Sequence, residues 1–302
     1  MDARVELLHS VAVATVTVDA GIPETHPSVA ILGPSRAGTG SVVDAGGVVL
    51  VANYTVLGAT DVEVTDVLGK RRRATVVAQD FASGLAAVST DGLKDAIKPG
   101  DSHTLSTGDD VFLVSSLGGG ERRSASGAVV AIESFDAYWE YKLDRAVMVS
   151  AANPGLGGAA LCNGRGELVG VVSLNLGAVG REALAIPAEN FFDYRAELLG
   201  NGRRVTRSPR PWIGMFCYSL PGKTVVAGVM PGSPGEEAGL RPGDVVLRLN
   251  GESFSDRGQL YERLWTYKPG DLVELDVLRD GTNANLKIRS RDAEDFFAID
   301  TN

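Results

Sequence analysis

Short runs of apolar and β-branched residues, separated by glycine-containing turns, recur from Val11 to about Pro187. Little helical spacing lies between them, and this combination is typical of antiparallel barrels and sandwiches. The pattern predicts strands at Val11–Val18, Gly40–Val51, Val62–Thr65, Ala74–Ala78, Ala86–Ser89, Asp110–Ser116, Ser126–Glu133, Ala146–Ser150, Leu168–Leu174 and Glu182–Ile186. We therefore expect a mainly β fold for the first domain, residues 1–202.

The end of this domain and the start of the next are marked by a change in composition. The segment from Pro187 to Leu199 has helical spacing and stops at a Gly-Asn-Gly sequence. A basic, proline-containing stretch follows over residues 203–211, as expected of an exposed linker. With 302 residues and 44% hydrophobic content, the chain suits about two domains, and the second should cover residues 212–295.

Charge and hydropathy narrow the possible partners. The net charge of −9 argues against nucleic acid or an anionic membrane surface as the main partner. The one basic run, Lys70–Arg73, follows a turn, and we favour a solvated hairpin end over a polyanion site. No apolar stretch is long enough to span a membrane, and the charged segment Met1–Leu7 does not resemble a secretory signal peptide.

Cysteine and histidine usage predicts neither a cofactor nor a metal. Cys162 and Cys217 fall in different predicted domains, so a disulfide is not expected, and they lack the spacing of a zinc site. His9, His26 and His103 are interpreted as surface residues, in preference to a catalytic base or metal ligands.

A glycine-rich segment over residues 153–160, Asn-Pro-Gly-Leu-Gly-Gly-Ala-Ala, carries the candidate chemistry. A serine hydrolase presents its hydroxyl on such a tight turn, where backbone N–H groups hold the oxyanion of the intermediate. Here Gly157 stands where the serine would be. The alternative is that the glycines are kept for the backbone shape of the turn alone.

The wider segment 149–172 resembles the nucleophile region of the HtrA (Deg) family of trypsin-like proteases. Residues 38–43, 49–59 and 76–88 resemble the family motifs that lead to the catalytic histidine and aspartate. The resemblance implies two six-stranded β-barrels with the site in the cleft between them. The triad positions fall on Tyr54 for histidine, Gly84 for aspartate and Gly157 for serine.

None of these three residues suits its triad role. Glycine offers no nucleophile, and tyrosine, with a pKa of about 10, is a poor base at neutral pH. The neighbours Thr55 and Ser83 cannot replace an imidazole or a carboxylate. We therefore expect a catalytically inactive pseudoprotease, not an enzyme. An active HtrA-type serine endopeptidase with relocated catalytic residues is the competing interpretation.

The loop Gly155, Leu156 and Gly157 is accordingly interpreted as a vestigial oxyanion loop. Its N–H groups would still be able to bind a peptide carbonyl without cleaving it. Ser150 and Ser173 lack the Gly-x-Ser-Gly context of an oxyanion turn and are interpreted as structural.

After the linker, the chain resembles a PDZ domain of the HtrA type. The resemblance lies in Trp-Ile-Gly-Met at 212–215 and in residues 229–246, which read VMPGSPGEEAGLRPGDVV. Such a domain adds an extended peptide as a strand and holds its terminal carboxylate on backbone N–H groups. The resemblance assigns peptide binding to Trp212, Ile213, Gly214, Met215 and Phe216, and to Leu260 and Leu264 on a predicted helix Asp256–Thr266. Alternatively, the two leucines pack into the domain core.

The expected role is binding of peptides or protein C-termini in protein quality control, as an adaptor, a chaperone-like binder or a regulator of an active protease homologue. A purely structural role is a further alternative. The family forms trimers through N-terminal aromatic segments, whereas the first aromatic residue here is Tyr54, so the sequence argues against that trimer contact. The family mostly works outside the cytoplasm, and a chain from which a leader had been removed would look the same as a cytoplasmic protein.

Overall fold

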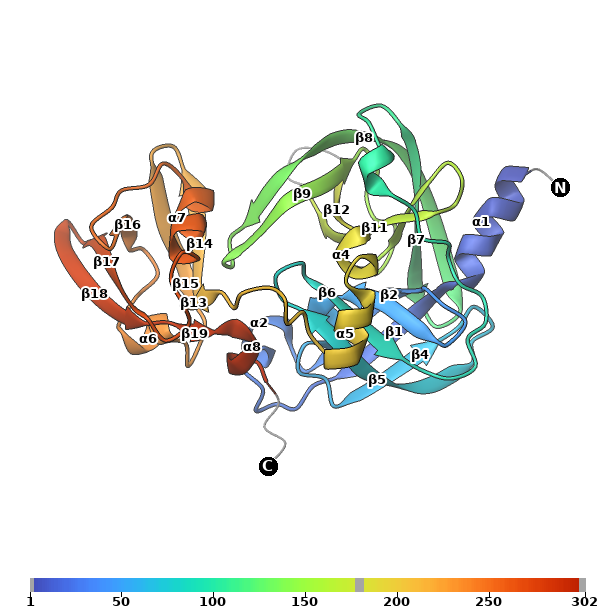
Figure 1. Ribbon diagram of the computed structural model, residues 1–302, viewed down its shortest axis with the longest axis horizontal. Helices are drawn as coiled ribbons and strands as arrows, with labels where there is room; N and C mark the ends of the chain where they lie inside the picture. The colour runs from blue at the N-terminus through green and yellow to red at the C-terminus, as the bar shows by residue number, and fades with distance from the viewer. Residues whose placement is uncertain (1–2, 177–181, 299–302) are drawn as a thin grey trace. The chain divides into compact units, whose positions relative to one another are not determined.

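The computed structural model describes residues 3–176 and 182–298 and divides the chain into two compact units (Figure 1). The first unit contains the residues up to Glu24, Ile31–Ser134 and Asp144–Val205. The second contains Thr25–Ala30, Phe135–Leu143 and the chain from Thr206 onward. The boundaries that the sequence predicts at 202 and 211 stay predictions. The structure also assigns two short segments from earlier in the chain, Thr25–Ala30 and Phe135–Leu143, to the second unit.

The first unit begins with a closed six-stranded barrel in the order β1-β2-β3-β6-β5-β4. All neighbouring strands pair antiparallel, and branched side chains such as Val16, Val49 and Val88 fill the interior. The strands are β1 Thr15–Gly21, β2 Ser35–Val42, β3 Val48–Ala52, β4 Asp61–Thr65, β5 Arg71–Asp80 and β6 Leu85–Ser89.

A second closed barrel follows in the order β10-β11-β12-β9-β8-β7. Its core includes Leu113, Val147, Leu161 and Val169, all without exposed surface. The strands are β7 Asp110–Gly118, β8 Glu121–Ala137, β9 Tyr141–Val149, β10 Ala160–Asn163, β11 Leu168–Asn175 and β12 Ala183–Pro187. The prediction of two six-stranded barrels is confirmed.

Short helices lie at the ends and corners of these barrels: α1 Ala3–Val13, α2 Val29–Leu32, α3 Asn53–Val56, η1 Ser102–Thr104, α4 Glu189–Phe192 and α5 Arg195–Asn201. The strand predicted from Val11 is wrong at its start, because residues 11–13 belong to α1. The predicted run Gly40–Val51 is divided by a turn into β2 and β3. The helix predicted over Pro187–Leu199 is two short helices.

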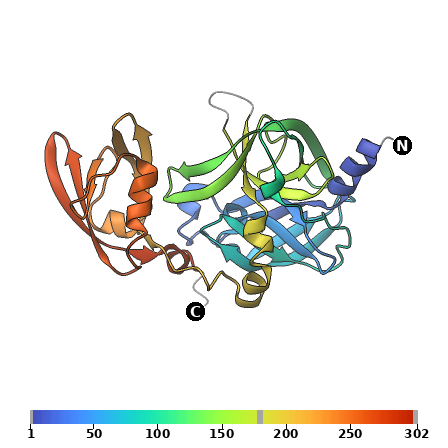
Figure 2. The same cartoon turned by 45° about the horizontal axis from the view of Figure 1, so that its top comes forward.

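The second unit is built on a five-stranded antiparallel sheet, ordered β14 to β18. The helix α7 lies beside β14 in both views (Figures 1 and 2), and its N-cap residue Asp256 accepts a hydrogen bond from the Gln259 N–H. The strands are β14 Met215–Leu220, β15 Lys223–Val229, β16 Val245–Leu249, β17 Leu272–Arg279 and β18 Thr282–Arg289, with the small pair β13 Pro211–Trp212 and β19 Arg291–Asp292. The helices are α6 Pro234–Glu237, α7 Arg257–Leu264 and α8 Ala293–Phe296.

The expectations about the cysteines, the histidines and a membrane-spanning helix can be compared with the structure. Cys162 and Cys217 are free thiols, and both are buried. His9 and His103 are exposed, but His26 is only 7% exposed, so the expectation of three surface histidines is wrong for His26. Both ring nitrogens of His26 have partners, because Nδ1 lies 2.7 Å from Ser28 Oγ and Nε2 lies 3.0 Å from the Phe297 carbonyl oxygen. No helix within the described residues is both long enough and apolar enough to cross a bilayer.

Candidate functional site

The three expected triad positions meet in the first unit. Tyr54 lies on α3, and a Cβ placed on Gly157 would be 2.1 Å from its hydroxyl oxygen. The carbonyl of Gly84 accepts a 2.8 Å hydrogen bond from the N–H of Asn53, the residue before Tyr54. The structure therefore puts Gly157 against Tyr54, whose hydroxyl fills the space that a side chain at 157 would use, and bonds Gly84 to the residue before Tyr54.

The Tyr54 hydroxyl acts here as a hydrogen-bond donor. It donates to the Ser173 carbonyl over 3.2 Å. Burial raises the pKa of Tyr54 to about 12, because the phenolate would lose its hydration. At neutral pH the group thus keeps its proton, and it does not act as a base.

The loop over Gly155, Leu156 and Gly157 is held by hydrogen bonds within the first unit. The Leu156 N–H donates to the Ser116 carbonyl over 2.8 Å, and the Gly155 N–H donates to Asn153 Oδ1 over 3.3 Å. On the acceptor side, the Gly157 carbonyl takes a 2.7 Å bond from the Thr39 N–H. Two N–H groups of the loop are therefore engaged, and its role as an oxyanion loop stays a prediction.

The loop before β14 in the second unit holds a carboxylate. Glu140 Oε2 accepts from the Ile213 N–H over 3.1 Å, and Oε1 accepts from the Met215 N–H over 2.6 Å. The Gly214 N–H between them also stabilises the ionised Glu140 carboxylate. Gly214 has φ +82°, and a Cβ there would lie 2.3 Å from Ser233 Cβ, so only glycine fits this turn. Three successive N–H groups thus point at one anion, as in a backbone nest.

The other expected peptide-binding residues occupy different surroundings. Ile213 and Met215 contribute their side chains to the core of the second unit, and the Trp212 ring packs 4.6 Å from the Phe296 ring. Phe216 is half-buried on β14. Leu260 and Leu264 have no exposed surface and belong to the core, so their contact with a peptide stays a prediction.

Three polar residues beside the nest were not found from the sequence: Glu140, Arg257 and Tyr261. The last two lie on α7 at spacing i, i+4, which puts them on one face of the helix. The Tyr261 hydroxyl donates to the Ala137 carbonyl over 3.0 Å. The sequence pattern identified this helix from its apolar residues and therefore missed Arg257 and Tyr261, although their i, i+4 spacing can be seen in the sequence.

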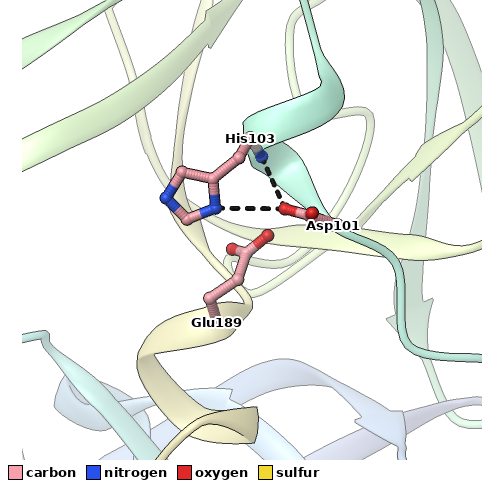
Figure 3. Close-up of side chains that lie close together, drawn as sticks. All are labelled: Asp101, His103 and Glu189. Carbon is pink, nitrogen blue, oxygen red and sulfur yellow. Dashed lines mark hydrogen bonds and ion pairs between the residues drawn. The ribbon is translucent and has the colours of Figure 1, made fainter.

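One cluster in the first unit has the side chains of a metal site. The ligand atoms of Asp101, His103 and Glu189 lie within 4.8 Å of one another (Figure 3). His103 Nδ1 is 3.0 Å from Asp101 Oδ1, and Glu189 Oε2 accepts from the Ser102 hydroxyl over 3.0 Å. Hydrogen bonds within the protein already use these groups, so they account for the cluster without a metal ion.

Comparison with known proteins agrees with the two-part architecture. Residues 38–171 match the family model described as a trypsin-like peptidase domain, and residues 202–289 match that of the PDZ domain. The solved structure titled "HtrA-type protease AlgW with tripeptide" has a TM-score of 0.59 and 23% identity, covering 96% of this chain and 97% of its own. The serine endoprotease from Yersinia pestis has a TM-score of 0.57 and 21% identity, covering 97% and 98%. These two structures support the fold.

Relatives by sequence carry the names of serine proteases. A probable periplasmic serine endoprotease, DegP-like, from Ectopseudomonas mendocina is 29% identical over 83% of this chain and 55% of its own length. The serine protease Do-like HtrA of Lactobacillus helveticus is 27% identical over 80% of this chain and 65% of its own. The chain therefore spans between about half and two thirds of the length of these relatives.

These relatives contradict the expectation that the chain is not an enzyme. They are named serine endoproteases or serine proteases, and the structural neighbours are HtrA-type proteases. The expectation of an inactive protein was inferred from only three positions that lack the side chains of a catalytic triad. The assignment of triad positions to Tyr54, Gly84 and Gly157 is not tested by the relatives and stays a prediction. The chain thus has a trypsin-like double barrel followed by a PDZ domain, and the two domain matches and the named relatives support an HtrA family protein.

Proposed function

We propose that this HtrA family protein recognises peptides or protein C-termini by their terminal carboxylate, through the PDZ domain. The observation that carries the proposal is the nest of N–H groups at Ile213, Gly214 and Met215, which holds a carboxylate. The edge of β14 continues from this nest and offers the main-chain groups to which an added strand pairs.

The test compares one peptide with two C-termini, a free carboxylate and an amide, by fluorescence anisotropy. The proposal predicts that amidation weakens binding at least tenfold. Equal affinity for the two forms would overturn recognition of the carboxylate.

A pair of glycine variants locates the site. Gly214→Ala strains the φ of +82° and collides with Ser233, so it should distort the nest and weaken binding. Gly222→Ala is the matched control, because Gly222 has φ +70° in the β14–β15 turn and nothing within 4 Å of the added Cβ. The control should retain the affinity of the wild type.

Endopeptidase activity of the HtrA type is the second candidate function, and the relatives' names favour it. Because Gly157 has no side chain, the proposal requires a nucleophile from another position. Incubation with unfolded casein and a fluorophosphonate probe tests it, with mass spectrometry to locate the label. Casein cleavage together with labelling of one serine would support it, and intact, unlabelled protein would refute it.

We also propose where this protein works and what it does there. A position outside the cytoplasm is supported by relatives named periplasmic. There the protein would bind unfolded or truncated polypeptides in protein quality control, alone or with an active protease homologue. Cell fractionation tests the location, and recovery in the cytosolic fraction would contradict it.

A further inference from the structure

The PDZ groove of the second unit contains a segment of the same chain. Phe135–Leu143, the tip of the hairpin formed by β8 and β9, belongs to this unit together with the residues from Thr206 onward. Glu140 in this tip places its side-chain carboxylate on the nest, where the terminal carboxylate of a peptide would bind. Glu140 is only 8% exposed.

One main-chain hydrogen bond links the tip to β14. The Cys217 N–H donates to the Tyr138 carbonyl over 2.6 Å. Tyr138 precedes Glu140 by two residues, and Cys217 follows Met215 by two, so the two segments run antiparallel. The tip therefore supplies an anion to the nest and a main-chain acceptor to the edge of β14.

The tip differs from a free peptide because its main chain does not end at Glu140 but continues into β9. Glu140 has φ +49°, an uncommon left-handed conformation for a residue other than glycine. This turn takes the main chain onward into β9 and leaves the side chain to enter the nest. The Glu140 N–H donates instead to the Tyr261 hydroxyl over 3.1 Å. A side-chain carboxylate thus replaces a chain terminus.

Contacts on both sides of the groove hold the tip. On the α7 side, Arg257 Nε donates to Asp136 Oδ2 over 2.6 Å, and its Nη2 donates to the Asp136 carbonyl over 2.6 Å. On the β14 side, the Tyr138 ring lies 5.9 Å from the Phe216 ring and 6.0 Å from the Tyr218 ring. The groove therefore contacts an acidic residue and an aromatic residue of its occupant.

We infer that the hairpin tip 136–140 is an internal ligand of the PDZ groove, and that an external peptide binds by displacing it. The inference deepens the proposed function and rests on it. The same contacts define the class of competitor. It has a free C-terminal carboxylate, an aromatic residue two positions before the terminus to take the place of Tyr138, and an acidic residue two positions further back to take that of Asp136.

The electrostatic surroundings of Glu140 make this contact displaceable. Burial raises the pKa of Glu140 to about 7, more than the N–H groups of Met215, Ile213 and Gly214 lower it. The ionisable groups that interact with it are Cys217 and Tyr261, and Arg257 interacts with both of these. Removing the carboxylate from water thus opposes docking at neutral pH, and a peptide terminus competes against a contact that is only partly favourable.

The test measures peptide affinity in the full chain and in Glu140→Ala. The probe is a fluorescein-labelled peptide that copies residues 133–139 and ends in a valine with a free carboxylate. We expect Glu140→Ala to bind it at least tenfold more tightly than the wild type. Glu133→Ala, which removes an exposed glutamate of β8, is the matched control and should bind as the wild type does. Equal affinity of the wild type and Glu140→Ala would overturn the inference.

A second measurement separates this inference from the proposed function. Hydrogen exchange of the amides of Ile213, Met215 and Cys217 reports the internal contact without any added peptide. Exchange should accelerate at least tenfold in Glu140→Ala and also in Tyr261→Phe, which retains the ring but loses the hydroxyl. Accelerated exchange without peptide binding would support the internal ligand and refute the proposed function. Unchanged exchange in both variants would overturn the internal ligand.

Discussion

Replacing Gly157 with alanine would put a methyl group into space that the Tyr54 hydroxyl occupies. The added Cβ would lie 2.1 Å from the hydroxyl oxygen and 3.2 Å from the ring carbon Cζ. The φ of Gly157 is not positive, so alanine adds no backbone strain, and the collision with Tyr54 should dominate. Removing the hydroxyl with Tyr54→Phe should therefore rescue the alanine variant.

The expected energies follow from these contacts. Overpacking at Gly157→Ala should cost about 1–3 kcal/mol. Loss of the hydrogen bond from Tyr54 to Ser173 should add about 1 kcal/mol, because the ring must move away. Tyr54→Phe alone loses only that bond, about 1 kcal/mol. In the double variant the nearest ring atom is Cζ, so the total should be close to that of Tyr54→Phe, with a coupling of about 2–4 kcal/mol.

The assay is a double-mutant cycle on the free energy of unfolding in urea, followed by circular dichroism. All three tryptophans, Trp139, Trp212 and Trp265, lie in the second unit, so their fluorescence does not follow the barrels. Gly155→Ala is the control, because its Cβ would meet the Ser116 carbonyl at 2.3 Å, and Tyr54→Phe should not rescue it. If Gly157→Ala and Tyr54→Phe add to within about 0.5 kcal/mol, the convergence of the two positions is refuted.

Three further predictions concern other groups. Arg279→Ala should lower the urea midpoint of the second unit, because it removes the guanidinium that lies 2.7 Å from the buried Asp244 carboxylate; an unchanged midpoint would contradict this. The rise in the pKa of Glu140 from 4.5 to about 7 means that docking is strongest below pH 4.5 and loses about 3 kcal/mol as the pH rises through 7. Peptide affinity should therefore increase from pH 5 to 8 in the wild type and stay level in Glu140→Gln, and an equal slope in both would refute the cause. Burial raises the pKa of Cys162 and Cys217, so a thiol reagent should modify them only after unfolding, and rapid reaction of the native protein would contradict their burial.

The sequence predicted those features that depend on local motifs. Glycine turns and short β-forming runs fix the two barrels, and the residues around Gly214 have the pattern of a carboxylate-binding loop. The family motifs around the expected histidine and serine positions also pointed to Tyr54 and Gly157, which the structure brings together.

The contact between Glu140 and the nest could not be predicted in the same way. It joins residues more than seventy positions apart, and a glutamate in a hairpin turn usually faces water. The apolar pattern of α7 identified Leu260 and Leu264, which are in the core, whereas Arg257 and Tyr261 contact the hairpin tip. His26 was missed for a related reason, because its partner, the Phe297 carbonyl, lies near the other end of the chain.

The most direct test of carboxylate recognition is the NMR signal of the Ile213 and Met215 amides. Both amides donate to the Glu140 carboxylate, so their protons should resonate downfield in the wild type and move upfield in Glu140→Ala. Addition of a peptide with a free C-terminus should restore the downfield positions, and the same peptide with an amidated terminus should not. Amide signals that are the same in the wild type and the variant, and that respond to neither peptide, would contradict the account.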